Sequence, residues 1–342
     1  MIPARRDFSM APVSDLPRPK VVLLATGGTI AGSADARSPA AYNAGAVSAE
    51  ALLAAVPESG SIARLAAEQL AAIGSQDMSE TVWLALARRI AALDADPEVD
   101  AILVTHGTDT LEETALFLDL THGGETPVIL VGAMRPSSAT SADGPANLLA
   151  ALMVAVSPET HGRGVVVVLN DVVHGARDVT KTSTTAVETF QSPNFGPLGR
   201  VTPNGVRYFN PPPPRRAPLG LPDALPPVAI LHAHAGMDDV LLRAAWTSGA
   251  RGLVLAGVGD GNGARPVIAA LAEAAAAGLA CVRASRCPAG PVLRNIEVSD
   301  DALGLVAAGH LNPAKARVLL QLLLANGITD APSLQAAFDA VG

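Results

Sequence analysis

Residues 21–29 read Val21-Val22-Leu23-Leu24-Ala25-Thr26-Gly27-Gly28-Thr29, an apolar run that ends in a turn with two glycines. Continuous β-branched and aliphatic residues are typical of a strand that is buried on both faces of a sheet. The glycine pair allows the backbone to turn tightly after the strand, because glycine tolerates conformations that other residues avoid. This stretch therefore predicts a central parallel strand that ends in a polar turn.

Similar apolar runs recur along the chain, and amphipathic stretches lie between several of them. The predicted strands cover residues 101–105, 128–131, 165–169, 228–231 and 253–256, and the predicted helices cover roughly residues 77–94, 110–120, 143–156, 266–278 and 313–325. Buried strands that alternate with helices indicate an α/β fold with a mainly parallel sheet flanked by helices. Near residues 198–209, the sequence Pro203-Asn204-Gly205 predicts a β-hairpin.

A proline-rich segment at residues 210–227 divides the chain. Such proline density cannot continue a helix or a central strand, and it favours an extended linker. We therefore predict a large N-terminal catalytic domain at residues 20–209 and a smaller C-terminal α/β domain at residues 228–342. Residues 1–19, which contain charged residues and several prolines, are expected to form a flexible N-terminal extension.

The composition limits the classes of partner. The 342-residue chain is 49% hydrophobic and only 3% aromatic, so it can bury a sizeable aliphatic core. Its formal net charge of −8 disfavours nucleic acid and anionic membranes, because both require a basic face. No stretch supplies about 20 uninterrupted apolar residues, so no membrane span is expected.

Two further features concern the compartment and the thiols. The first 20 residues contain no apolar core of an export signal, which predicts a cytoplasmic protein. A periplasmic location stays open, because a chain whose signal has been removed has the same features. Cys281 and Cys287 lie close together in sequence, but spacing alone does not decide whether they form a disulfide.

Polar turns follow two of the apolar runs. Thr26-Gly27-Gly28-Thr29 follows the run at residues 21–25, and Thr105-His106-Gly107-Thr108-Asp109-Thr110 follows the run at residues 101–104. In parallel α/β sheets, ligands bind outside the carboxyl ends of the strands. We therefore expect the two turns to converge on one pocket.

The polar residues have both a structural and a catalytic interpretation. Thr29 and Asp109 are each placed to cap a following helix, and Lys181 can be read as an ordinary surface lysine. In the catalytic interpretation, Thr29 is a nucleophile that needs a base, for which Tyr42 is the candidate, within a stretch that could act as a lid. If Lys181 is buried beside Thr108 and Asp109, the three side chains form a proton relay.

The two turns resemble the motifs of the bacterial asparaginase family, in its type II form. Five further blocks are similar to the family and follow in the family's order. They lie at residues 73–78, 131–136, 141–145, 177–182 and 311–317. A single Thr-Gly-Gly-Thr turn is a weak signal, whereas seven ordered blocks are a specific one.

The resemblance implies the roles of the catalytic residues. Thr29 is the nucleophile, and Tyr42 is its activating neighbour. Thr108, Asp109 and Lys181 form a second triad, in which Thr108 polarises or attacks the scissile amide. The implied reaction is hydrolysis of L-asparagine to L-aspartate and ammonia, with the extent of activity on L-glutamine left open. It requires no metal and no organic cofactor.

The resemblance also implies a substrate pocket that is shared between subunits. Ser75 and Gln76 hold the α-carboxylate and α-amino ends of the substrate, and Asp109 also pairs with its ammonium. Asn262 and Glu297 from a neighbouring subunit complete the pocket, so the C-terminal domain contributes to that subunit's site. The family is typically a homotetramer of intimate dimers, and we expect this assembly here.

Other functions remain open on the residues alone. A glutaminase-asparaginase of broad specificity is one alternative, because L-glutamine and L-asparagine differ by one methylene, a difference worth only about 1–3 kcal/mol in a pocket. An inactive relative that binds amino acids and keeps only the fold is another. Gly259-x-Gly261-x-x-Ala264 is a weak match to a dinucleotide-binding fingerprint. The candidate ligands for a metal hydrolase are His232, His234, Asp238 and Asp239.

Overall fold

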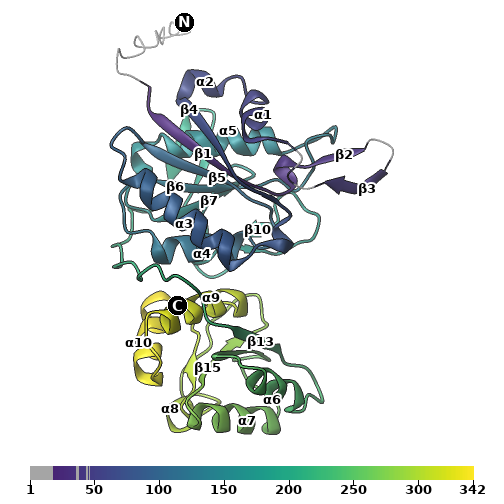
Figure 1. The fold of residues 1–342 in the computed structure, drawn as a ribbon, viewed down its shortest axis with the longest axis vertical. Coiled ribbons are helices and arrows are strands. Elements are labelled where there is room, and N and C mark those ends of the chain that lie inside the picture. The colour runs from purple at the N-terminus through teal and green to yellow at the C-terminus, as the bar shows by residue number, and fades with distance from the viewer. Residues whose placement is uncertain (1–17, 36–37, 44, 46) are drawn as a thin grey trace, which may run out of the picture.

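The computed structural model describes residues 18–35, 38–43, 45 and 47–342 of the chain. Two α/β units are stacked along the long axis of the molecule, and the C-terminus lies where they meet (Figure 1). Residues 1–17 of the predicted N-terminal extension lie outside the described residues.

The N-terminal unit is built on a large, mostly parallel sheet. Its strands are β1 (Lys20–Gly27), β4 (Arg64–Ile73), β5 (Ala101–Thr105), β6 (Val128–Val131), β7 (Val165–Leu169), β8 (Val172–Gly175), β11 (Gly199–Thr202) and β12 (Gly205–Tyr208). Among the described residues these eight strands pair in the order β12-β11-β8-β7-β6-β5-β1-β4. The five strands β7-β6-β5-β1-β4 of this order are parallel to one another. The pairs β7–β8, β8–β11 and β11–β12 are antiparallel, and the β11–β12 pair is the predicted hairpin.

Helices cover both faces of this sheet (Figure 1). They are α1 (Ala49–Ala54), α2 (Ser59–Ile62), α3 (Glu80–Asp94), α4 (Leu111–Thr121) and α5 (Gly144–Ala155). Leu24 of β1 belongs to a core cluster with α3 and α4, whereas Leu23 belongs to a second cluster with α1 and α5. Both leucines are fully buried. The run at residues 21–25 is therefore apolar because both of its faces are covered by helices.

The C-terminal unit has a smaller parallel sheet. Its strands are β13 (Val228–His232), β14 (Gly252–Gly257), β15 (Ala280–Ser285) and β16 (Val306–Ala307), and its helices are α6 (Val240–Thr247), α7 (Arg265–Ala276), α8 (Asp300–Leu303), α9 (Pro313–Ala325) and α10 (Ala331–Val341). Leu255 of β14 packs with α6 and α7, whereas Val254 faces α9 and α10. Because α9 shares its core cluster with α4, the apolar core continues from one unit into the other.

Short elements complete the described chain. They are η1 (Thr29–Ala31), β2 (Ser33–Asp35), β3 (Ser38–Asn43), η2 (Ser75–Asp77), η3 (Pro158–Thr160), β9 (Thr180–Lys181) and β10 (Phe190–Gln191). Strands β2 and β3 form an antiparallel ribbon that extends from the N-terminal unit (Figure 1). Strand β9 pairs with β10.

The predicted strands and helices are confirmed, with small shifts at their ends. Helix α3 begins at Glu80 rather than near residue 77, because Ser79 caps it by accepting a hydrogen bond from the Val82 amide. Strand β4 was not predicted from the sequence. Its sequence is rich in alanine and leucine, which favour helices, but pairing with β1 makes it a strand.

The described stretch between Tyr208 and Val228 contains no helix or strand, as the proline content predicts. This linker is nevertheless fixed to the N-terminal unit. The amide of Leu219 donates to the Leu120 carbonyl at 2.8 Å, and Nη2 of Arg215 donates to the His122 carbonyl at 2.8 Å. Its proline-rich backbone is therefore extended but anchored.

The structure answers the question of the disulfide. Both cysteines lie in the described part of the chain, and each has a free thiol. Cys281 is buried in β15, and burial raises its pKa to about 12, whereas Cys287 is exposed. The two cysteines therefore do not crosslink the C-terminal unit.

His174 of β8 gives the fold a defined dependence on pH. Burial is the main cause that lowers its pKa from 6.5 to about 4, against the opposing effect of the Asp178 carboxylate. As the pH falls, His174 is protonated in the unfolded chain before it is protonated in the folded protein. The contribution of His174 to the free energy of unfolding is therefore complete above pH 6.5 and is lost as the pH falls toward about 4. We expect the Tm of the wild type to fall more than that of His174→Gln between roughly pH 7 and pH 5.

A matched control for this comparison is His234→Gln, since His234 is exposed. The Tm of that variant should follow the wild type across the same interval. Equal losses of Tm in the wild type and in His174→Gln would contradict the assignment.

Candidate active site

The turns after β1 and β5 lie against each other, as the sequence predicts. Gly27 and Gly28 adopt φ angles of 108° and 80°, and a Cβ placed on Gly28 would lie 2.3 Å from the Cα of Gly107. Thr26 Oγ1 donates to the Thr105 carbonyl at 2.8 Å. Only glycine permits this approach and this backbone conformation, so the glycine pair is required for the two turns to meet.

Thr29 does not occupy the cap position that one interpretation gave it. It begins η1, and the residue at the cap position is Gly28. The Thr29 side chain is partly buried, directly after the contact between Gly28 and Gly107. Its placement at the carboxyl end of a central parallel strand is where α/β proteins bind ligands.

Lys181 joins the second turn and forms a close triad with it. Its Nζ donates to Thr108 Oγ1 at 2.9 Å and to Asp109 Oδ1 at 2.6 Å. The Lys181 side chain is 19% exposed and the Asp109 side chain 58%. Lys181 is therefore not an ordinary surface lysine. The cap position of α4 belongs to Thr110, so the capping interpretation of Asp109 is wrong as well.

Ser75 and Gln76 lie in η2, directly after β4. Ser75 is buried, and its Oγ accepts a hydrogen bond from the Asp109 amide at 3.0 Å while its carbonyl accepts one from Thr110 Oγ1 at 2.8 Å. Gln76 is exposed and donates to the neighbouring Asp77 carboxylate. Because the Ser75 hydroxyl accepts one hydrogen bond here, it retains its own hydrogen for a ligand.

His106 fixes the turn from below. It is fully buried, its Nδ1 contacts the Gly107 carbonyl at 2.6 Å, and its Nε2 contacts Thr114 Oγ1 at 2.8 Å. Burial lowers the pKa of His106 to about 4, so the ring is neutral near pH 7. Since Thr114 also accepts from the Trp83 indole, its hydroxyl donates to Nε2 and the Nδ1 hydrogen is donated to Gly107.

Two residues behind Lys181, Glu112 and Asn312, were not identified as site residues from the sequence. The Glu112 carboxylate accepts from the Lys181 amide at 2.9 Å and from Asn312 Nδ2 at 3.0 Å. Asn312 also caps α9 through the Lys315 amide. Asn312 lies in one of the blocks that resemble the family, and Glu112 closely follows another, but only the fold shows that they connect the C-terminal unit to Lys181.

Asn262 and Glu297 lie together in the C-terminal unit, away from the two threonine turns of the N-terminal unit. Asn262 Nδ2 donates to Glu297 Oε2 at 2.9 Å, and the Glu297 side chain is exposed. Asn262 follows β14, and Glu297 precedes α8. The structure therefore brings this pair together as a separate surface feature.

The backbone of Tyr42 lies in β3, where it pairs with Ala34 of β2. Its side chain lies outside the described part of the structure, so its catalytic role stays a prediction. The remaining candidate residues lie in described segments.

The alternative ligand sites have little support from the geometry. Within the described ranges, no group of three or more histidine, cysteine, aspartate or glutamate side chains could hold a metal ion. In the glycine turn after β14, Val258 and Asn262 exchange two backbone hydrogen bonds of 2.8 Å. The turn is therefore closed by backbone hydrogen bonds between its two ends.

Comparison with known proteins agrees with this arrangement. Residues 20–214 match the model of the asparaginase N-terminal domain, and residues 227–338 match the glutaminase/asparaginase C-terminal domain. A probable periplasmic L-asparaginase of Haemophilus influenzae is 49% identical over 92% of this chain and 91% of its own. L-asparaginase 2 of Escherichia coli is 48% identical over 90% and 89%, and a glutaminase-asparaginase of Pseudomonas fluorescens is 41% identical over 93% and 89%.

Both family models together cover nearly all of the described chain, and the relatives align along most of their own length. The two domains, the order of the sequence blocks and the position of the threonine turns are consistent with these matches. This chain belongs to the asparaginase family.

Proposed function

We propose that this chain hydrolyses L-asparagine to L-aspartate and ammonia, with Thr29 as the nucleophile. The observation that carries the proposal is the pair of Lys181 contacts, 2.9 Å to Thr108 Oγ1 and 2.6 Å to Asp109 Oδ1. Relatives that are named L-asparaginase or glutaminase-asparaginase support the same reaction. The intact threonines and Lys181 argue against an inactive amino-acid-binding relative.

In the first step, Thr29 Oγ attacks the amide carbon of the substrate. The tetrahedral intermediate expels ammonia, which takes up the proton lost by the threonine, and an aspartyl ester of Thr29 remains. Water then attacks the ester and releases aspartate. Backbone amides near Thr29 and Thr108 would stabilise the oxyanion, a contribution of roughly 3–4 kcal/mol for each donor.

Thr108 and Lys181 would assist these proton transfers. Because Lys181 Nζ donates to Thr108 Oγ1, the hydroxyl hydrogen of Thr108 points away from the lysine. Asp109 holds the lysine from its other side. The three groups can therefore orient the attacking water and move a proton without a metal or an organic cofactor.

The substrate carries one positive and one negative group on its α-carbon. The partly exposed Asp109 carboxylate suits the α-ammonium. Ser75 offers its remaining hydroxyl hydrogen to the α-carboxylate, and the exposed Gln76 lies next to it. Tyr42 is proposed to activate Thr29.

We further propose a homotetramer of intimate dimers, in which Asn262 and Glu297 complete a neighbouring subunit's site. Two large apolar side chains of the loop that carries Glu297 are exposed: Leu293 is 48% exposed and Ile296 is 68% exposed. Grouped exposed apolar residues usually mark an interface. A subunit contact there would cover them and bring Glu297 to a second copy of the chain.

Specificity and location remain predictions. Activity on L-glutamine is the second candidate, because the Pseudomonas fluorescens relative is named a glutaminase-asparaginase. A cytoplasmic location is expected from the sequence, whereas the Haemophilus influenzae relative is named periplasmic. In the part of the chain that the structure describes, no helix is long and apolar enough to cross a membrane.

Thr29→Ala should lower kcat for ammonia release from L-asparagine by about three orders of magnitude or more, because it removes the hydroxyl that is proposed to form the ester. Thr247→Ala is a control that removes an exposed threonine from α6. Steady-state ammonia release with both variants and the wild type checks the assignment. Undiminished turnover in Thr29→Ala would show that Thr29 is not the nucleophile.

Lys181→Met should lower kcat by roughly 10²- to 10⁴-fold, since it removes the proton donor to Thr108 and keeps a side chain of similar length. The KM for L-asparagine should change much less. Lys20→Met, which removes a lysine paired with Asp96 outside the site, is the control. An unchanged kcat in Lys181→Met would exclude the relay.

A site that is shared between subunits predicts complementation. Thr29→Ala and Glu297→Ala subunits, purified as mixed oligomers with two tags, should regain activity that neither variant has alone. In a mixed dimer, one site combines an intact Thr29 with an intact Glu297, so about half of the wild-type activity is expected. If the mixed oligomers are as inactive as the parents, the pair does not act across the interface.

A further inference from the structure

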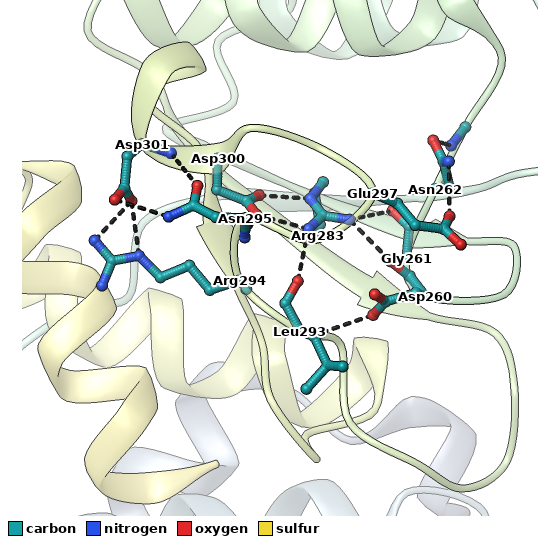
Figure 2. Close-up of polar contacts among 12 residues, drawn as sticks. Asp260, Gly261, Asn262, Arg283, Leu293, Arg294, Asn295, Glu297, Asp300 and Asp301 are labelled. Atoms are coloured by element: carbon teal, nitrogen blue, oxygen red, sulfur yellow. Dashed lines mark hydrogen bonds and ion pairs between the residues drawn. The ribbon is translucent and has the colours of Figure 1, made fainter.

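Arg283 of β15 lies at the centre of the polar contacts in Figure 2. Its side chain and that of Asp300 are both 0% exposed. Nε donates to Asp300 Oδ1 at 2.6 Å, and Nη2 donates to Oδ2 at 2.8 Å. A buried charge must be paired and hydrogen-bonded, and this two-point contact holds the planar guanidinium in one orientation.

The other N–H groups of Arg283 bind the backbone of two separate loops. Nη1 donates to the carbonyls of Asp260 and Gly261 at 2.9 and 3.2 Å, in the turn that also carries Asn262. Nη2 also contacts the Leu293 carbonyl at 3.4 Å, in the loop that carries Glu297. One buried side chain therefore joins the two loops from which these residues project (Figure 2).

The same two loops are also connected at the surface. Asp260 Oδ1 accepts from the Leu293 amide at 2.7 Å. Asp300 Oδ2 accepts from the Asn295 amide at 2.9 Å, and this contact holds the residue just before Ile296 and Glu297. Through these contacts the position of Glu297 relative to Asn262 is set by backbone groups on both sides of Arg283.

We infer that Arg283 is a positioning residue for the amide hydrolysis. It touches neither substrate nor catalytic threonine. With Asp300 it fixes the distance and direction at which Asn262 and Glu297 are presented to the neighbouring subunit's site. This inference rests on the proposed function of Asn262 and Glu297. It states that the buried guanidinium of Arg283 determines how these two side chains are placed relative to each other.

Arg283→Lys is the informative substitution. Lysine keeps the positive charge beside Asp300, but it has no planar fork that could bind both carboxylate oxygens and the loop carbonyls together. We expect the KM for L-asparagine to rise about tenfold with a smaller change in kcat, because the substrate-contacting pair is displaced while Thr29 and Lys181 are intact. Arg294→Lys is the matched control. It alters an exposed arginine of the same loop, paired with Asp301, and should stay within about twofold of wild type.

Asp260→Ala is a second, milder variant in case Arg283→Lys does not fold. It removes the contact with the Leu293 amide and leaves the buried ion pair in place. The KM should rise in the same direction, by about threefold, with little change in Tm.

Mixed oligomers separate positioning from general destabilisation. In a mixed dimer of Arg283→Lys with Thr29→Ala, the one site with an intact Thr29 receives an undisturbed Asn262–Glu297 pair from the Thr29→Ala subunit. Its KM should therefore return to the wild-type value. A KM that stays raised in the mixed oligomer would mean that Arg283 acts within its own subunit and would overturn the inference.

Glu297→Gln distinguishes failure of the inference from failure of the proposed function. If Glu297→Gln leaves the KM unchanged, the pair does not contact the substrate and the proposed shared site is wrong. If Glu297→Gln raises the KM while Arg283→Lys and Asp260→Ala do not, the shared site stands and the positioning role is wrong.

Discussion

The backbones after β1 and β5 approach each other at Gly28 and Gly107 so closely that a side chain cannot fit between them. The rest of the site depends on this contact. It brings the turn that carries Thr29, at the end of β1, against the turn that carries Thr108, at the end of β5. Ser75 enters the same junction, because a Cβ on Gly107 would lie 2.6 Å from the Ser75 hydroxyl. Close backbone packing at the two glycines therefore holds the three strand ends together, along with hydrogen bonds such as those from Thr26 Oγ1 to the Thr105 carbonyl and from the Asp109 amide to Ser75 Oγ.

Buried and partly buried polar groups support this junction through hydrogen bonds. Neutral His106 lies beneath the second turn and fixes its carbonyl. Glu112 lies behind Lys181 and connects it to Asn312 of the C-terminal unit. Lys315, which is also buried, donates to the carbonyls of the segment that leads to β9. The proposed proton relay is therefore in contact with residues from both units, because Glu112 joins Lys181 to Asn312 of the C-terminal unit.

The buried Arg283–Asp300 pair illustrates how a costly interaction can serve geometry. A buried ion pair adds little net stability compared with apolar residues of similar size, yet removing one partner costs about 3–5 kcal/mol. Such a pair is explained more readily by the orientation that it imposes. Here the orientation involves the backbone of the two loops that carry Asn262 and Glu297.

The sequence by itself determined the α/β fold, the central strands and the family, because buried parallel strands need apolar residues on both faces and because glycine turns and polar blocks recur at fixed places. It did not predict β4, whose alanine- and leucine-rich sequence becomes a strand only by pairing with β1. Nor did it decide whether Asp109 caps a helix or whether Lys181 lies free on the surface. The structure decides both questions through contacts between distant residues: Lys181 lies within 3 Å of Thr108, Asp109 and Glu112. The contact of Arg283 with Asp300 is likewise seen only in the fold. Contacts between residues far apart in the chain are decided by packing, and only the tertiary structure contains that information.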